Sequence, residues 1–387
     1  MVTRSWGRDG GVGAHVQAAA AALAASGVDV HVLAARIDGE ERFPGVTVCR
    51  LPRIGDRRAS PQERLGAYVG ARALAVHFHQ LEDPGFVDHV RRSAPVLISA
   101  HGYPGCTSGV YFFEPGHECT RAHGPGCVPN LLARGCAHTR YPRTLPRKYL
   151  NVSRGLASFR RADRAISYSS AVDRHLAANG LQRRAVIPFF PTVPPSGPAA
   201  PAHERRVLVA GRVDHTKGME VLIEAISRLD AELVVCGEGR HEAAMRRLAE
   251  RLGVAERVRF AGWLAPERLA QEIAAAAIVA MPSLWPEPFG LVGLEAMAAA
   301  RPVVASATGG ILDWLQDGVT GLAVAPGDVQ ALAGALGELL ADPARRRAMG
   351  EAGRALVATR FTRQRHVDGL LEAYATARGH WQGGQPA

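Results

Sequence analysis

The sequence predicts an α/β protein made of two doubly wound domains, each a parallel sheet between layers of helices. Apolar strand segments alternate with amphipathic helical segments along most of the chain, which is typical of parallel sheets. A proline- and alanine-rich stretch at 191–205 interrupts this alternation and has the composition of a semi-rigid linker. The 387 residues are enough to build two separate cores.

The first predicted domain covers residues 1–190. Met1–Arg4 is expected to end a short strand, which leads into the glycine turn Gly10–Gly13 and then into a helix. A second strand is predicted over 28–36, and this strand–turn–helix–strand order begins a doubly wound sheet. The acid that normally ends this second strand in a dinucleotide-binding dehydrogenase is missing, so that class is disfavoured.

An irregular insertion at 103–148 follows a strand that is predicted to end at His101. Its four cysteines lack the Cys-x-x-Cys spacing of most structural zinc sites, although histidines lie among them. The sequence leaves open metal ligands, a disulfide or free thiols, and free thiols suit a reducing cytosol. The four are Cys106, Cys119, Cys127 and Cys136.

The second predicted domain covers residues 206–358, where the strand–helix alternation begins again. Helices are expected at 327–341 and 343–358. The remaining segment, 359–387, is expected to form a last helix, which crosses back to the first domain, and a tail.

Two acids define the most informative segment of this second domain. Glu287 precedes a helix that is predicted to begin at Phe289-Gly290, and Glu295 lies a little over one turn inside that helix. The free backbone N–H groups at a helix start bind phosphate, and an acid can accept hydrogen bonds from a ribose. The segment therefore predicts a site for a sugar-bearing diphosphate.

The lysines of the chain point to the same chemistry. Among 46 basic residues only Lys148 and Lys217 are lysines. Lys217 lies with Arg212 in a polar loop between a predicted strand and helix, where a compact ammonium suits a phosphate. A solvated loop lysine is the alternative.

The formal net charge of +10 is uneven, with twelve Arg or Lys and two Asp at 134–184. This indicates either an anionic partner, such as a membrane face or a phosphorylated acceptor, or solvated arginine-rich helix faces. Nucleic acid is not expected, since no basic motif with interleaved aromatic residues occurs. No secretory leader or membrane-length apolar run is evident, so the expected location is cytoplasmic, with peripheral contact at the inner membrane face left open.

Six motifs together resemble the GT-B glycosyltransferases of glycosyltransferase family 4, a retaining group with an E-x7-E motif. The resemblance implies two Rossmann-like domains that face a central cleft, and it covers nearly the whole chain. Gly102 departs from it, because many relatives have an Asp after the histidine. The motifs are GGVGAHV (10–16), HGY (101–103), AGRVDHTKG (210–218), GWL (262–264), PEPFGLVGLEAMA (286–298) and ATGG (307–310).

The resemblance also implies roles for single residues. Glu287 would lie by the donor sugar and Glu295 would bind the ribose. Arg212 and Lys217 would neutralise the departing diphosphate, and His101 would lie near the reacting centre. The implied donor-binding positions are completed by Gly11, Gly13, Gly211, Phe289, Gly290, Leu291 and, around the base, Gly262, Trp263 and Leu264.

The function that follows is retaining transfer of a sugar from a UDP- or GDP-linked donor to a hydroxyl of a glycan, lipid-linked or small-molecule acceptor. The insertion loosely resembles that of relatives which build cell-surface polysaccharides. No Asp-x-Asp motif is present, so no metal or other cofactor is expected. The alternatives are a non-catalytic sugar-nucleotide-binding protein and a sugar-nucleotide epimerase of the same fold.

Overall fold

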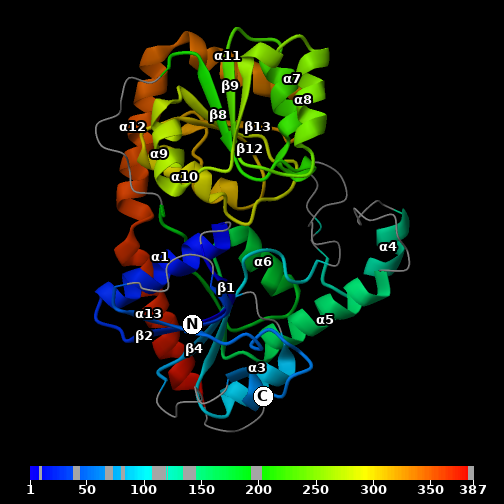
Figure 1. The fold of residues 1–387 in the computed structure, drawn as a ribbon, viewed down its shortest axis with the longest axis vertical. Helices are drawn as coiled ribbons and strands as arrows, with labels where there is room; N and C mark the ends of the chain where they lie inside the picture. Colours follow the sequence, from blue (N-terminus) through cyan, green and yellow to red (C-terminus); the bar gives the residue numbers. More distant parts are fainter. Residues whose placement is uncertain are drawn as a thin grey trace. The chain divides into compact units, whose positions relative to one another are not determined.

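The computed structural model describes residues 1–7, 11–37, 44–65, 73–79, 83–106, 119, 121–133, 145–192 and 203–381. Within these ranges the chain forms two compact units (Figure 1). The first unit contains the residues up to Phe189 and the segment that begins at Arg363, and the second runs from Phe190 to Thr362. Gly10, Cys136 and most of the predicted insertion and linker lie outside the described residues.

The first unit is built on a parallel sheet of seven strands in the order β3-β2-β1-β4-β5-β6-β7. The order reverses at β1 and β4, which is the mark of a doubly wound sheet. β1 continues two residues beyond the expected end at Arg4. The strands are β1 (Val2–Trp6), β2 (Val30–Ile37), β3 (Val46–Arg50), β4 (Val76–His79), β5 (Val96–Ser99), β6 (Arg164–Ser167) and β7 (Arg184–Val186).

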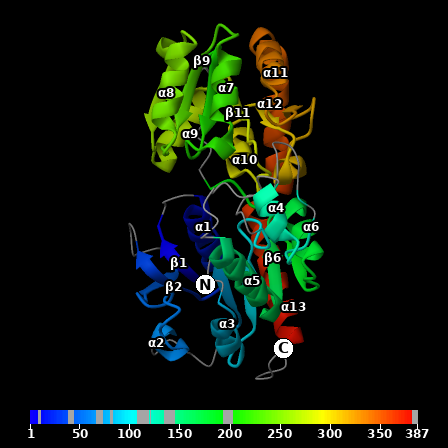
Figure 2. The ribbon, with the colours of Figure 1, turned by 90° about the vertical axis from the view of Figure 1, so that its right-hand side faces the viewer.

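Seven helices of the first unit are described. The last of them, α13, buries Val367, Leu370 and Tyr374 within this unit. Helix α5 packs against α3, as Figure 2 shows. The helices are α1 (Gly11–Ala25), α2 (Pro61–Leu65), α3 (Pro84–Arg91), α4 (Cys127–Ala133), α5 (Leu145–Arg161), α6 (Ser170–Ala178) and α13 (Arg363–His380).

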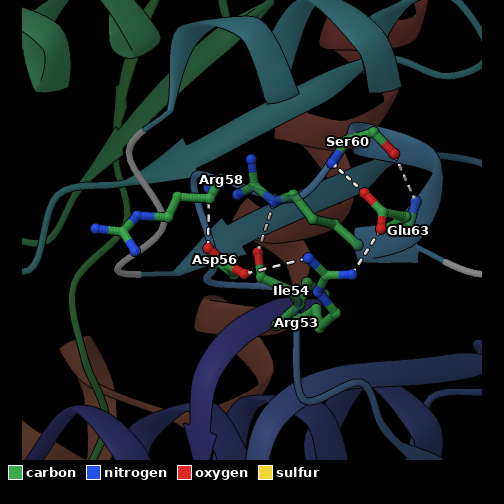
Figure 3. Close-up of polar contacts among 7 residues, drawn as sticks. Arg53, Ile54, Asp56, Arg58, Ser60 and Glu63 are labelled. Atoms are coloured by element: carbon green, nitrogen blue, oxygen red, sulfur yellow. Dashed lines mark hydrogen bonds and ion pairs between the residues drawn. The ribbon is translucent and has the colours of Figure 1, made fainter.

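The polar stretch before α2 is ordered by its own side chains (Figure 3). The Ser60 hydroxyl accepts from the Glu63 N–H at 3.2 Å, and the Ser60 N–H donates to Glu63 Oε2 at 2.7 Å. This reciprocal pair is a capping box, which satisfies two backbone donors at a helix start. Arg53 donates to Glu63 Oε1 at 2.6 Å, and the Arg58 N–H donates to Asp56 at 2.9 Å. Local chemistry therefore fixes this loop.

The second unit has a parallel sheet of six strands in the order β10-β9-β8-β11-β12-β13, again with a reversal in the strand order. In Figure 1 this sheet lies between α7 and α8 on one side and α9 and α10 on the other. Two parallel-sheet α/β domains were predicted, and both are confirmed. The strands are β8 (Arg206–Ala210), β9 (Glu232–Cys236), β10 (Val258–Gly262), β11 (Ile278–Met281), β12 (Val303–Ser306) and β13 (Gly321–Val324).

Apolar side chains of the strands and of α7, α8 and α11 pack into one core of the second unit, among them Leu222, Ile278 and Leu336, which are fully buried. No helix in the described ranges is long and apolar enough to span a bilayer. The helices are α7 (Met219–Ile226), α8 (Glu242–Arg251), α9 (Pro266–Ala275), α10 (Leu291–Ala298), α11 (Val329–Ala341) and α12 (Pro343–Arg360), with 3-10 turns at His215–Lys217, Ala255–Arg257 and Gly309–Asp313.

Candidate functional site

The predicted residues of the second unit gather at one edge of its sheet. Strands β8, β11 and β12 are adjacent and parallel, so the loops that follow them leave from the same carboxyl edge. These loops are 211–218, 282–290 and 307–310. Ligands of open α/β sheets bind at such an edge.

Lys217 and Glu287, which were predicted separately, form an ion pair with Nζ 2.6 Å from Oε1. The same oxygen accepts from the Ser283 hydroxyl at 2.5 Å and from the Trp285 indole N–H at 3.2 Å. Glu287 is only 4% exposed. One buried carboxylate oxygen therefore fixes the position of the ammonium group.

The loop that carries Lys217 requires a glycine next to it. Asp214 caps the 3-10 turn by accepting from the Thr216 N–H at 3.1 Å. Gly218 then has φ of 66°, and a Cβ there would lie 1.9 Å from the Pro282 carbonyl oxygen. Only glycine allows this approach of the β8 and β11 loops. Arg212 is exposed in the same loop.

The diglycine turn after β12 supports Glu287 from the other side. The Gly310 N–H donates to the Glu287 carbonyl at 2.7 Å. Gly309 has φ of 59°, and a Cβ there would lie 2.4 Å from the same carbonyl oxygen. The ATGG motif thus has a structural reason that the sequence did not reveal.

The start of α10 is fixed by Trp314, which sequence reasoning missed. Its indole N–H donates to the Phe289 carbonyl at 2.7 Å, and both side chains are buried. Gly290 caps the helix with φ of 89°. Because Trp314 lies 25 residues from Phe289, no local pattern could have indicated the contact.

Gly293→Ala should distort this helix start. A Cβ at Gly293 would lie 2.1 Å from the Trp314 ring, so the ring must move and loosen its bond to Phe289. We expect a loss of about 2 kcal/mol in the free energy of unfolding, measured by denaturant titration. Gly334→Ala is the control, since Gly334 is an exposed helical glycine with no atom within 4 Å of an added Cβ. Alanine there should be neutral or stabilising, and equal effects of the two substitutions would contradict the steric argument.

Glu295 is buried in α10, with 8% of it exposed. The Thr192 hydroxyl donates to Glu295 Oε1 at 3.0 Å. A hydroxyl donor is what a ribose would offer to the same carboxylate. Thr192 is a second neighbour that sequence reasoning missed, because 103 residues separate the pair.

The segment predicted to bind the base lies at the end of β10. The Gly237 N–H donates to the Gly262 carbonyl at 2.7 Å, and the Trp263 N–H donates to Glu238 at 3.2 Å. The Trp263 side chain is 54% exposed, so it does not fill the core. A Cβ at Gly237 would lie 2.0 Å from the Gly211 carbonyl oxygen, which ties this segment to the β8 loop.

Gly11, Gly13 and His101 belong to the first unit. A Cβ at Gly13 would lie 2.2 Å from the Gly7 carbonyl oxygen, so packing of α1 against the end of β1 already requires this glycine. Gly11 is exposed and has open space around it. His101 follows β5, and its Nε2 lies 2.9 Å from Nδ1 of His79. Burial lowers the pKa of His101 to about 3.

His101 is one of five histidines that pack together in the first unit, here called the histidine cluster. Desolvation by burial lowers the pKa of every member, to about 4 for His366 and well below 6.5 for the three others. All five are therefore neutral at pH 7. The histidine cluster consists of His15, His77, His79, His101 and His366.

The described residues contain no group of three or more His, Cys, Asp or Glu side chains placed to bind a metal ion. Cys119 and Cys127 are free thiols within those ranges, which also include Cys106, and Cys136 lies outside them.

Comparison with known proteins gives the site a family context. The family model described as glycosyl transferases group 1 matches residues 196–356. The D-inositol 3-phosphate glycosyltransferase of Xylanimonas cellulosilytica is 37% identical over 226 residues, which are 54% of this chain and 53% of the relative. The GDP-mannose-dependent alpha-(1-6)-phosphatidylinositol monomannoside mannosyltransferase of Mycolicibacterium smegmatis is 40% identical over 159 residues, which are 38% of this chain and 42% of the relative. The matched region thus spans about half or less of these curated relatives.

A solved structure matches over almost the whole length. Sucrose-phosphate synthase from Thermosynechococcus elongatus has a TM-score of 0.73 and 26% identity, covering 97% of this chain and 98% of that one. Its likeness extends over both parallel sheets. The second unit of this chain therefore contains a glycosyl transferases group 1 domain, and its two parallel-sheet units have the GT-B fold.

Proposed function

We propose that the protein is a retaining glycosyltransferase that moves a sugar from a nucleotide-diphosphate donor to an acceptor hydroxyl. The observation that carries the proposal is the Lys217–Glu287 ion pair, which lies at a ligand-binding sheet edge inside a glycosyl transferases group 1 domain. Intact polar chemistry at this edge argues against the non-catalytic sugar-nucleotide-binding protein, and the PEPFGLVGLE context of the two glutamates argues against the epimerase.

The geometry supports a defined role for Lys217. Breaking the sugar–phosphate bond develops negative charge on the departing diphosphate, and a fixed cation stabilises that charge. Lys217 is 22% exposed, while its partner Glu287 is buried and has two further donors in Ser283 and Trp285. An ammonium group has three N–H donors, so Lys217 can remain paired with Glu287 and still donate to the diphosphate. Arg212 in the same loop would supply a second cation.

The proposed chemistry retains the configuration at the anomeric carbon. The acceptor hydroxyl attacks the anomeric carbon on the same face of the sugar from which the diphosphate departs, and an oxygen of the departing phosphate takes the proton of that hydroxyl. No side-chain base is required, and we expect no metal requirement. Full turnover in excess EDTA is the expected result.

The donor is proposed to be UDP- or GDP-linked, and the name of one relative specifies GDP-mannose. The acceptor is proposed to be a glycan, a lipid-linked sugar or a small molecule. The names of the two relatives contain D-inositol 3-phosphate and phosphatidylinositol monomannoside, which supports a small-molecule or a lipid-linked acceptor. A cytoplasmic site of action, with peripheral contact at an anionic membrane, suits such acceptors.

The direct test is to incubate the protein with a panel of UDP- and GDP-sugars and with phosphorylated inositol and glycan acceptors. The readout is the amount of nucleoside diphosphate released. A donor that raises the melting midpoint and is also consumed supports transfer. Stabilisation by a donor without turnover on any acceptor would favour the non-catalytic protein, and conversion of the donor into another sugar nucleotide would favour the epimerase. The anomeric proton of the product distinguishes retention from inversion.

Glu295→Ala should weaken donor binding by about tenfold to a hundredfold. The buried carboxylate would no longer accept a hydrogen bond from the ribose, and one bond to a charged group contributes about 1.5–3 kcal/mol. Calorimetric titration with the free nucleoside diphosphate measures the change. Thr192→Val is the matched control, since it removes the native partner and keeps the carboxylate. Donor affinity that is unchanged in Glu295→Ala would exclude the ribose role.

A further inference from the structure

The first unit contains a histidine pair whose geometry goes beyond the role proposed for His101. Nδ1 of His79 and Nε2 of His101 are 2.9 Å apart, which is a hydrogen bond between two imidazoles. His79 is fully buried in β4, and His101 follows the neighbouring strand β5. Both rings are neutral at pH 7, because burial lowers both pKa values. One ring must therefore donate the proton and the other must accept it.

The second nitrogen of His79 decides the direction of this bond. His79 Nε2 is buried, and the described residues offer it no hydrogen-bond partner. If His101 donated, the single proton of His79 would be on Nε2 as a buried N–H without an acceptor. Buried N–H groups without a partner are rarer than unpaired acceptors. The less costly arrangement places the proton of His79 on Nδ1, so that His79 donates to His101.

The neighbouring histidine of β4 has the same tautomer for an independent reason. The Tyr168 hydroxyl donates to Ser99 Oγ at 2.6 Å, so the Ser99 proton is available to His77 Nε2 at 2.7 Å. His77 Nε2 is then an acceptor, and its Nδ1 donates to the Tyr374 hydroxyl at 3.0 Å. His77 and His79 lie on the same face of β4, since they are two residues apart. Their rings are 4.1 Å apart between centroids.

We propose that His79 is a positioning residue that holds His101 in the tautomer with its proton on Nδ1. His101 then has Nδ1 as a hydrogen-bond donor toward the donor substrate of the proposed reaction, and its Nε2, which accepts from His79, is not available to remove a proton from an acceptor. The donor-contact part rests on the proposed function. The tautomer part concerns the free protein alone.

The test is nitrogen NMR of the protein labelled with ¹⁵N-histidine, in which His101→Gln assigns the His101 signals. In the wild type, Nδ1 of His101 should have the chemical shift of a protonated ring nitrogen, and Nε2 that of an unprotonated one. His79→Leu should release this preference and give a mixture of tautomers. His79→Asn should restore it, because the amide can donate from the place of Nδ1. His77→Leu is the matched control: it removes a buried histidine of the same strand, and the His101 signals should not change.

Kinetics separate positioning from general damage to the fold. With a donor that the wild type consumes, His79→Leu should lower kcat/KM about tenfold, as expected for a misdirected hydrogen bond, and His79→Asn should recover most of it. A wild-type His101 with its proton on Nε2, or a tautomer unchanged in His79→Leu, would overturn the proposal even if His79→Leu is inactive or unstable. The wild-type spectrum alone decides the tautomer if the variant fails to fold. Absence of turnover in a wild type with the expected spectrum would instead count against the glycosyltransferase function.

Discussion

Lys217→Ala is expected to lower kcat by about 10²–10³, because it removes the cation that would face the departing diphosphate. Loss of one preorganised group that stabilises transition-state charge typically has this effect. In the free protein the substitution leaves Glu287 with Ser283 and Trp285 as donors. The fold should therefore survive, and the loss should be seen in steady-state and single-turnover rates more than in the melting midpoint.

The chain offers a matched control, since Lys148 is its other lysine. Lys148→Ala on α5 removes the same charge from the first unit and should leave kcat within about twofold. Glu287→Gln keeps the shape of the partner and removes its charge. Combining it with Lys217→Ala gives a double-mutant cycle, and residues that act as a unit should show strongly non-additive losses. Near-normal turnover of Lys217→Ala would remove the phosphate role.

The first unit is expected to lose stability steeply as the pH falls from 7 to 5. Burial lowers the pKa of all five members of the histidine cluster, to about 3 for His101 and about 4 for His366. The ordinary pKa of histidine is 6.5, so as the pH falls the histidines of the unfolded chain take up protons before those of the folded protein. The stabilisation that depends on neutral histidines is fully present above pH 6.5, and it is lost as the pH falls toward their folded-state pKa values. His101 and His366 each contribute roughly 2 kcal/mol between pH 7 and 5, and His15, His77 and His79 add to the loss in the same direction.

The surroundings of the histidine cluster offer little compensation for a new charge. They come from α1, β4, β5, α13 and the residue after β6, and they include the hydroxyls of Ser99, Tyr168 and Tyr374. The groups that shift these pKa values are the other histidines and the Met1 amino group, while the Pro188 carbonyl raises only that of His366. Protonation of several of these histidines therefore places positive charges next to one another in a buried cluster.

Hydrogen exchange read by mass spectrometry at pH 7 and pH 5 measures this loss in each unit separately, after correction for the intrinsic exchange rate. Protection should fall in β1, β4 and β5 and persist in β8 and β11, whose unit has no member of the histidine cluster. His15→Phe should reduce the slope of unfolding free energy against pH by about 1.4 kcal/mol per unit, because one titrating group is removed. Phenylalanine also removes the buried Nδ1 of His15, to which the described part of the chain offers no hydrogen-bond partner. His203→Phe, at an exposed position, should leave the slope unchanged. Equal acid lability of both units would contradict the prediction.

Local sequence determined much of this protein. The alternation of apolar strands and amphipathic helices predicts two parallel-sheet units, because the period of apolar residues is set within each element. The E-x7-E spacing also places Glu287 before α10 and Glu295 inside it, since a helix start depends on neighbouring residues. Lys217 stood out by composition and by its place after a strand.

Only the tertiary structure decided which of these groups meet. Lys217 and Glu287 pair across 70 residues, and Thr192 reaches Glu295 across 103. Helix α13 brings His366 and Tyr374 into the first unit, although the second unit lies between them and β4 in the chain. Gly13 was expected to allow a ligand to approach, but the structure also requires it for packing against Gly7. Such contacts depend on how distant strands and loops are placed by the folded sheets, and no local period or spacing in the chain encodes that placement.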